Sequence, residues 1–170
     1  MNRIAAQKLI DEWKRESSFM LEENGEFFFN IYLPIDYVEK INFHLLDENI
    51  NFDTFIIDCE LAYLIDNKLS EEVFPITYTA LEIRDFIDKE AENSPYKDRD
   101  DYIMVYITND VEGVHALTNL LELERAKNPL MTFDDLFVKF IDSYEKFDPD
   151  LLKSLLDRMD EEDDENKKKN

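Results

Sequence analysis

The sequence predicts an α+β domain with five or six helices, a sheet of three or four mostly antiparallel strands, and a helical C-terminal half. Three observations predict it. Apolar residues recur at helical spacing through most of the chain. Shorter runs rich in Phe, Tyr and Ile have the composition of strands. The 170 residues, 44 % of them hydrophobic and 13 % aromatic, suffice for one buried core but are few for two domains.

The first third of the chain predicts a helix, a hairpin and a second helix. A helix over residues 4–16 follows from four apolar residues at the spacing i, i+3, i+4 and i+7, namely Ala6, Leu9, Ile10 and Trp13. Two β-prone runs then flank Asn24-Gly25, a pair typical of tight hairpins. Pro34 ends the second of these strands, and residues 36–46 are predicted to form a helix.

The segment 52–66 fits two patterns comparably well, and both interpretations stay open. A helix would bring together Phe52, Phe55, Ile56, Cys59 and Tyr63. A strand would place every second residue on one side, namely Phe55, Ile57, Cys59, Leu61, Tyr63 and Ile65.

The second half of the chain carries clearer signals. Thr79 and Glu82 form a capping-box pattern that opens a helix ending near residue 92. Residues 93–101 are polar and predict a loop. The apolar run 102–108 has the composition of a buried strand.

Three helices are predicted after this strand. The first covers residues 110–127 and ends before Pro129. Thr132 caps the second, which carries an apolar stripe of Phe133, Leu136, Phe137, Phe140, Ile141 and Tyr144. Asp148 followed by Pro149 starts the third, which carries Leu151, Leu152, Leu155, Leu156 and Met159.

The charge of the chain is unusual. It has 41 acidic and 19 basic residues, so its formal net charge is −22 and its pI is about 4.3. Residues 160–170 hold six acids, three lysines and no apolar residue, which predicts a disordered tail after a single domain at residues 1–159. Without this tail the net charge is still −19. Solubility of a small domain needs a net charge of only roughly 2 to 8 in magnitude.

Several classes of function are excluded or disfavoured. The strong negative charge disfavours direct binding to nucleic acid or to anionic membranes. Two glycines, Gly25 and Gly113, cannot make a phosphate-binding loop. The pair Glu112 and His115 matches half of a di-iron motif that needs a second copy. We therefore predict no enzyme activity and no catalytic, cofactor-binding or metal-binding residues.

Cys59 bears on both chemistry and compartment. It lies between Asp58 and Glu60, whose charges would raise the pKa of its thiol and make it a poor nucleophile. As the only cysteine it cannot form an intrachain disulfide. No secretion signal or run of 18 apolar residues is visible, so the sequence predicts a cytoplasmic protein.

Between residues 22 and 66 the sequence has eleven acids and a single basic residue, Lys40. Acids on an ordered scaffold create a field of fixed geometry that can match a basic surface. The predicted partner-binding residues are Glu22, Glu23, Glu26, Asp36, Glu39, Asp47, Glu48 and Asp53.

The predicted function is binding to a basic partner protein, such as a nuclease or another nucleic-acid-binding enzyme. In the first interpretation the chain is a DNA-mimic-like inhibitor from a phage or mobile element, acting against CRISPR or restriction defence. In the second it is an immunity protein or antitoxin that neutralises a basic nuclease toxin. In the third it is an adaptor that binds through its amphipathic C-terminal helices. Acidity that serves only solubility is the simplest alternative.

Overall fold

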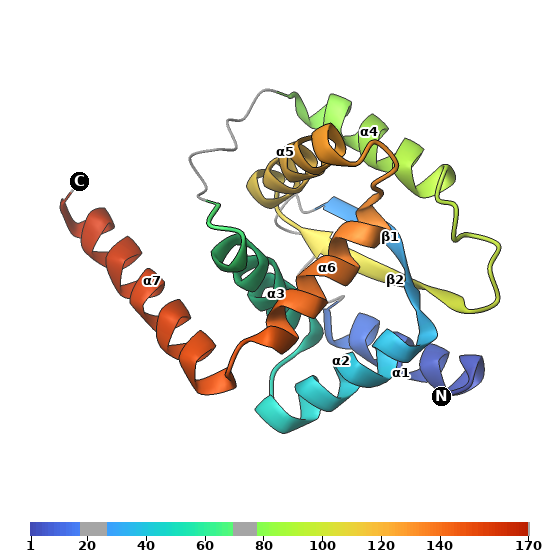
Figure 1. Ribbon diagram of the computed structural model, residues 1–170, viewed down its shortest axis with the longest axis horizontal. Coiled ribbons are helices and arrows are strands. Elements are labelled where there is room, and N and C mark those ends of the chain that lie inside the picture. The colour runs from blue at the N-terminus through green and yellow to red at the C-terminus, as the bar shows by residue number, and fades with distance from the viewer. Residues whose placement is uncertain (18–26, 70–77, 170) are drawn as a thin grey trace.

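The computed structural model describes residues 1–17, 27–69 and 78–169. Its centre is a two-stranded antiparallel sheet of β1 (Phe27–Pro34) and β2 (Tyr102–Asn109), surrounded by helices (Figure 1). The α+β class is confirmed. The predicted element counts are slightly wrong, since the described residues form seven helices and two strands. The first strand of the predicted hairpin and Asn24-Gly25 lie outside the described residues.

The sheet joins distant parts of the chain. Phe27 pairs with Asn109, and Pro34 pairs with Tyr102 at the other end of the register. Side chains alternate along β1, so that every second one is buried. The buried face of the sheet consists of Phe27, Phe29, Ile31 and Leu33 from β1 with Ile103, Val105 and Ile107 from β2.

Two helices close together in space, α3 (Phe52–Asp66) and α6 (Phe133–Lys146), form the helical part of the core. The ring of Phe29 lies 5.9 Å from that of Phe133 and 6.0 Å from that of Phe137, which places α6 over the buried face of the sheet. The predicted α6 stripe is thus core: its six members are all buried.

Residues 52–66 form a helix, so the helical interpretation is correct and the strand interpretation is wrong. α3 buries residues on most of its sides, namely Phe52, Phe55, Ile56, Cys59, Ala62, Tyr63 and Leu64. A helix surrounded by other elements has no single apolar stripe, which explains why its sequence also fitted a strand. The side chain of Asn51 caps its start by accepting a hydrogen bond from the amide of Thr54.

The remaining helices flank this centre. α1 (Arg3–Ser17) contacts β2 and α2 (Ile35–Glu48), while α4 (Ala80–Glu92) contacts β1 and α5 (Val111–Lys127). The capping box predicted at Thr79 and Glu82 is present. A second one at Thr132 and Asp135 opens α6.

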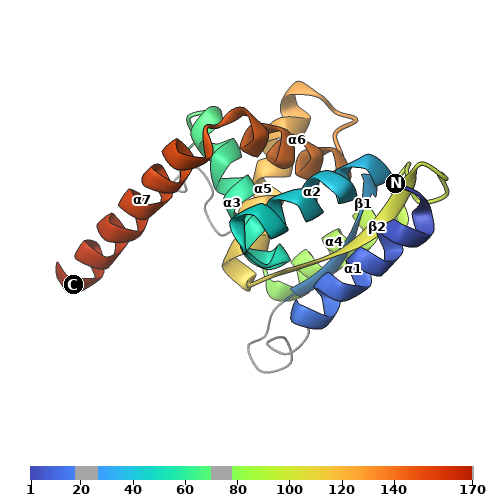
Figure 2. The same ribbon diagram turned by 90° about the horizontal axis from the view of Figure 1, so that it is seen from below.

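α7 (Pro149–Lys169) projects away from the rest of the molecule in both views (Figures 1 and 2). Asp148 caps it by accepting hydrogen bonds from the amides of Asp150 and Leu151. The structure differs here from the disordered tail predicted for residues 160–170, because residues 160–169 continue the helix. Three lysines in its last turn complement the negative end of the helix dipole.

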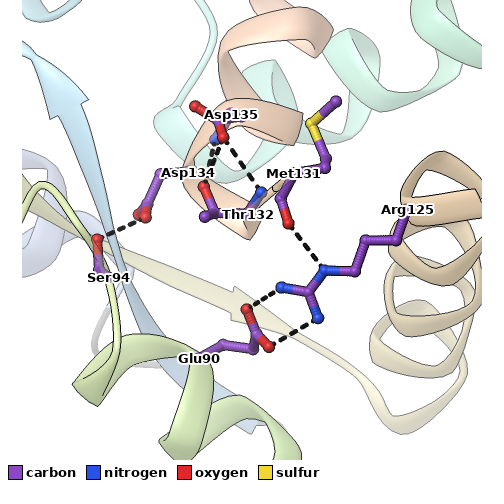
Figure 3. A network of polar contacts seen from close by, with 7 residues as sticks. All are labelled: Glu90, Ser94, Arg125, Met131, Thr132, Asp134 and Asp135. Carbon is purple, nitrogen blue, oxygen red and sulfur yellow. Dashed lines mark hydrogen bonds and ion pairs between the residues drawn. The ribbon is translucent and has the colours of Figure 1, made fainter. Parts of the chain in front are cut away.

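A polar network links α4, α5 and the start of α6 (Figure 3), and one further hydrogen bond joins it to β1. Arg125 of α5 binds both carboxylate oxygens of Glu90 on α4, at 2.9 and 2.6 Å. Asp134, buried at the start of α6, accepts hydrogen bonds from the hydroxyl of Ser94 and from the backbone amide of Tyr32 in β1. Burial raises the pKa of the Asp134 carboxyl, and these two hydrogen bonds oppose the rise.

Candidate functional site

The acidic helix α2 lies on the surface of the molecule, with one side packed against the core. It begins directly after Pro34, where β1 stops, and ends at Asn49, whose backbone is left-handed with φ 52°. Val38, Ile41 and Leu45 turn one side of the helix into the core. The opposite side must therefore face outwards along the whole helix.

The outward side of α2 combines carboxylates with large apolar side chains. Its members recur at helical spacing: Asp36, Glu39, Phe43, Leu46 and Asp47, which we call the α2 face. Phe43 is 63 % exposed and Leu46 is 75 % exposed, although both are large hydrophobic residues. Exposed apolar groups ringed by charge are typical of protein-binding surfaces.

The carboxylates of the α2 face are largely unneutralised. Within the described residues, which include every Lys and Arg of the chain, no Lys or Arg lies within 4 Å of Asp36 or Asp47. Glu39 is 3.8 Å from the amino group of Met1. Lys40 turns away to Glu145, at 3.4 Å, and lies over the ring of Tyr37.

The other predicted partner-binding residues are placed differently. Glu48 lies at the inner side of α2 and accepts a hydrogen bond from the hydroxyl of Tyr144. Asp53 is half-buried in the first turn of α3 and accepts one from Thr108, at 3.3 Å. Glu22, Glu23 and Glu26 lie outside the described residues. The structure thus brings Asp36, Glu39 and Asp47 together on one face and gives Glu48 and Asp53 internal partners.

Behind the α2 face, His44 links α2 to α6. Its two ring nitrogens lie 3.4 Å from Glu48 and 3.5 Å from Glu145. The ring stacks on Phe55 of α3 at 5.6 Å and meets Tyr144 edge-on. These contacts hold α2 against the core and so fix the orientation of its outer face.

The acids beside Cys59 do not form a paired-carboxylate site. On a helix Asp58 and Glu60 point in different directions, because residues two apart do not share a face. Burial, with the nearby charges of Glu48 and Asp160, raises the pKa of Asp58 to about 6. Cys59 itself is fully buried, and burial raises the pKa of its thiol well above the usual value. It is therefore a core residue.

The ring of His115 is also held by contacts inside the protein. It is buried in α5, and its ring nitrogens lie 2.7 Å from the carbonyl oxygen of Val111 and 2.6 Å from that of Tyr78. Glu112 is exposed and lies in a different setting, beside a groove between α3 and α5. Among the described residues no group of three or more His, Cys, Asp or Glu could hold a metal ion.

This groove between α3 and α5 has a volume of about 520 Å³. Apolar residues line it from both helices: Ile57, Leu61, Leu64, Ala116 and Leu120. The side chain of Asn109 lies directly over Gly113 at its edge, where a Cβ atom would collide with the Asn109 amide oxygen. Glycine at this position therefore permits the close approach of Asn109.

Sequence reasoning found the acids of the α2 face but missed Phe43 and Leu46. The signal was present, because Phe43 follows Glu39 by four residues and Leu46 follows it by seven.

Comparison with known proteins adds no further assignment: no family model, curated protein or solved structure matches the chain significantly. Within the described residues, no helix is both long enough and apolar enough to cross a membrane.

Proposed function

We propose that this chain is an inhibitor that binds a partner protein by placing its α2 face against a basic surface. The basic surface is one that nucleic acid would otherwise occupy. The observation that carries the proposal is the pair of exposed anchors, Phe43 and Leu46, set among the carboxylates of Asp36, Glu39 and Asp47. The carboxylates supply long-range attraction and the anchors supply buried area.

The spacing of the charges indicates what kind of surface fits. Asp36 and Asp47 are eleven residues apart, or about 16 Å along a helix that rises 1.5 Å per residue. Three carboxylates over this length give about one charge per 5 Å, against one per 1.7 Å of axis in duplex DNA. The α2 face is thus about a third as densely charged as a duplex. It favours a basic surface that also has an apolar hollow for Phe43.

The adaptor interpretation has less support. It relied on the amphipathic C-terminal helices, of which α7 projects away from the core with Leu151 exposed, whereas the stripe of α6 from Phe133 to Tyr144 is buried under the sheet and α3. A docking partner could not reach it without unfolding the core. The inhibitor and immunity-protein settings share the same physics, and the identity of the partner separates them.

The test is affinity capture with matched variants of the full chain. The charge variant is D36K/D47K, and the apolar variant is F43A/L46A. The control is D163K/D164K, which makes the same change of net charge on the projecting helix α7. We expect one stoichiometric partner to be held by the wild type and the control and to be lost by both α2 variants. Its release should need moderate salt, because exposed charges are screened within about 8 Å at physiological ionic strength.

A second measurement addresses the kind of surface that is occupied. The purified partner is titrated with labelled DNA or RNA in the presence of the chain. Competition supports the proposal, and a defence enzyme or a toxin as partner decides between inhibitor and immunity protein. Equal capture by the wild type and both α2 variants, or simultaneous binding of nucleic acid and chain, would contradict it.

A further inference from the structure

A second, smaller pocket lies between α4 and α5, at the other end of the molecule from α2 (Figure 1). Its volume is about 210 Å³, below the 300 to 1,000 Å³ typical of sites for drug-sized ligands. It is about the size of one long side chain. The residues lining it are Tyr78, Glu82, Ile83, Phe86, Thr118 and Glu122.

Two of the six side chains that line this pocket are aromatic, and contacts within the protein hold them in place. The ring of Phe86 is half-buried and meets Phe133 of α6 edge-on, with ring centres 5.8 Å apart. The hydroxyl of Tyr78 donates a hydrogen bond to Glu122, at 2.6 Å. Ile83 and Thr118 are buried and belong to the packed interface of α4 and α5. The pocket is thus part of the packed structure.

The two carboxylates of the pocket each have one oxygen in a hydrogen bond. One oxygen of Glu82 accepts from the amide of Thr79 in the capping box, and one oxygen of Glu122 accepts from Tyr78. Among the described residues, which include every Lys and Arg, none of these cations lies within 4 Å of either carboxylate. Two negative charges therefore flank an aromatic pocket without a cation to balance them.

An alkyl chain that ends in a cation matches this chemistry. Its stem can lie against Phe86 and Ile83, while its charged end meets the aromatic face and the carboxylates. We propose that this pocket binds the ammonium or guanidinium side chain of one Lys or Arg of a protein partner. The proposal goes beyond the α2 face and does not depend on it, because the residues involved are different.

The test is an NMR titration of the full chain with capped amino acids, following backbone amide signals. The probes are the N-acetyl methylamides of lysine and arginine, with norleucine as the uncharged match for the lysine stem. Spermidine tests whether a free polyamine is the source of the cation. We expect saturable shifts confined to residues 78–86 and 118–122, with millimolar affinity for a cationic amino acid. Norleucine should cause no comparable shifts.

The matched variant is E82Q/E122Q. Glutamine keeps the capping box and keeps an acceptor for Tyr78, so the fold is retained while both charges are removed. We expect affinity to fall about tenfold or more, because the variant removes both charged acceptors that the cation would meet. The control D88N removes an exposed charge from α4 outside the pocket and should leave affinity unchanged.

Three outcomes would overturn the proposal. The first is equal shifts with norleucine, which would indicate a purely apolar site. The second is affinity that E82Q/E122Q does not change, or shifts spread over the whole acidic surface. The third is binding of spermidine at the pocket without binding of either amino acid derivative, which would assign the site to a free polyamine.

Discussion

Replacing Asp58 by Asn is expected to stabilise the protein at neutral pH. Asp58 is half-buried in α3, near the charges of Glu48 and Asp160, and these surroundings raise its pKa to about 6 from the ordinary 3.8. A carboxyl with a raised pKa in the folded state is more easily protonated there than in the unfolded chain. Its ionisation therefore costs stability as the pH rises from about 4 to about 6, and Asn cannot ionise.

The size of this effect follows from the shift in pKa. Each unit corresponds to about 1.36 kcal/mol, so the change from 3.8 to about 6 would give about 3 kcal/mol. Asp58 is only partly buried, and solvent screening reduces this figure to about 1 to 2 kcal/mol. For a chain of this length each kcal/mol corresponds to about 2 to 4 °C in melting temperature.

The assay is urea unfolding followed by circular dichroism at several pH values between 4 and 8. The free energy of unfolding of D58N minus that of the wild type should grow between pH 4 and pH 6 and stay level above. The exposed control D88N on α4 should show a much smaller dependence. If D58N is less stable than the wild type at pH 7, or if the difference does not vary with pH, the reasoning is refuted.

Three further predictions concern single residues. The variant D134A should lose about 2 to 4 kcal/mol in urea unfolding, because it leaves the part-buried Tyr32 amide and the buried Ser94 hydroxyl without their acceptor. I41A should lose about 2 to 5 kcal/mol by the same assay, whereas F43A, on the exposed side of the same helix, should change stability by less than about 0.5 kcal/mol. Cys59 should react with a thiol reagent such as DTNB only when the chain unfolds, which absorbance at 412 nm would follow, and fast labelling of the native protein would show that it is not core.

Most helices could be predicted from the sequence because their signals are local. Thr79 and Glu82 act across three residues, and the structure contains that capping box. Residues 52–66 were harder, because α3 is buried on most sides and its apolar residues follow no single period. Asn51 was an overlooked local signal: an Asn immediately before such a run is a typical helix cap.

The strand pairing and the full length of α7 could not be predicted from local sequence patterns. The described partner of β1 is β2, some seventy residues later, and no local pattern specifies such a pairing. Residues 160–169 lack the apolar groups that a packed helix needs, so composition predicted disorder. They extend a helix that Asp148 has already started, so each further residue adds a backbone hydrogen bond without the cost of a new helix nucleus. The single domain at residues 1–159 stays a prediction.

The candidate site was predictable only in part. The helical spacing of Asp36, Glu39 and Asp47 places them on one side of α2, given a helix there. The internal roles of Glu48 and Asp53 were not predictable, since their partners Tyr144 and Thr108 are distant in the sequence. Which acids are free to meet a partner is decided by tertiary contacts.

The pairing of β1 with β2 also bears on how the chain is made. Partners in the sheet are separated by 68 residues, for Pro34 and Tyr102, up to 82, for Phe27 and Asn109. At roughly 5 to 20 residues per second, a ribosome needs about 3 to 16 s to synthesise the chain between them. During that time the run from Phe27 to Leu33, with three consecutive phenylalanines, cannot pair with β2 because β2 has not yet been synthesised. Unpaired apolar strands of this kind aggregate readily. Recoding the stretch between the strands for slower translation should therefore lower the yield of folded protein, and a chaperone that covers β1 should restore it.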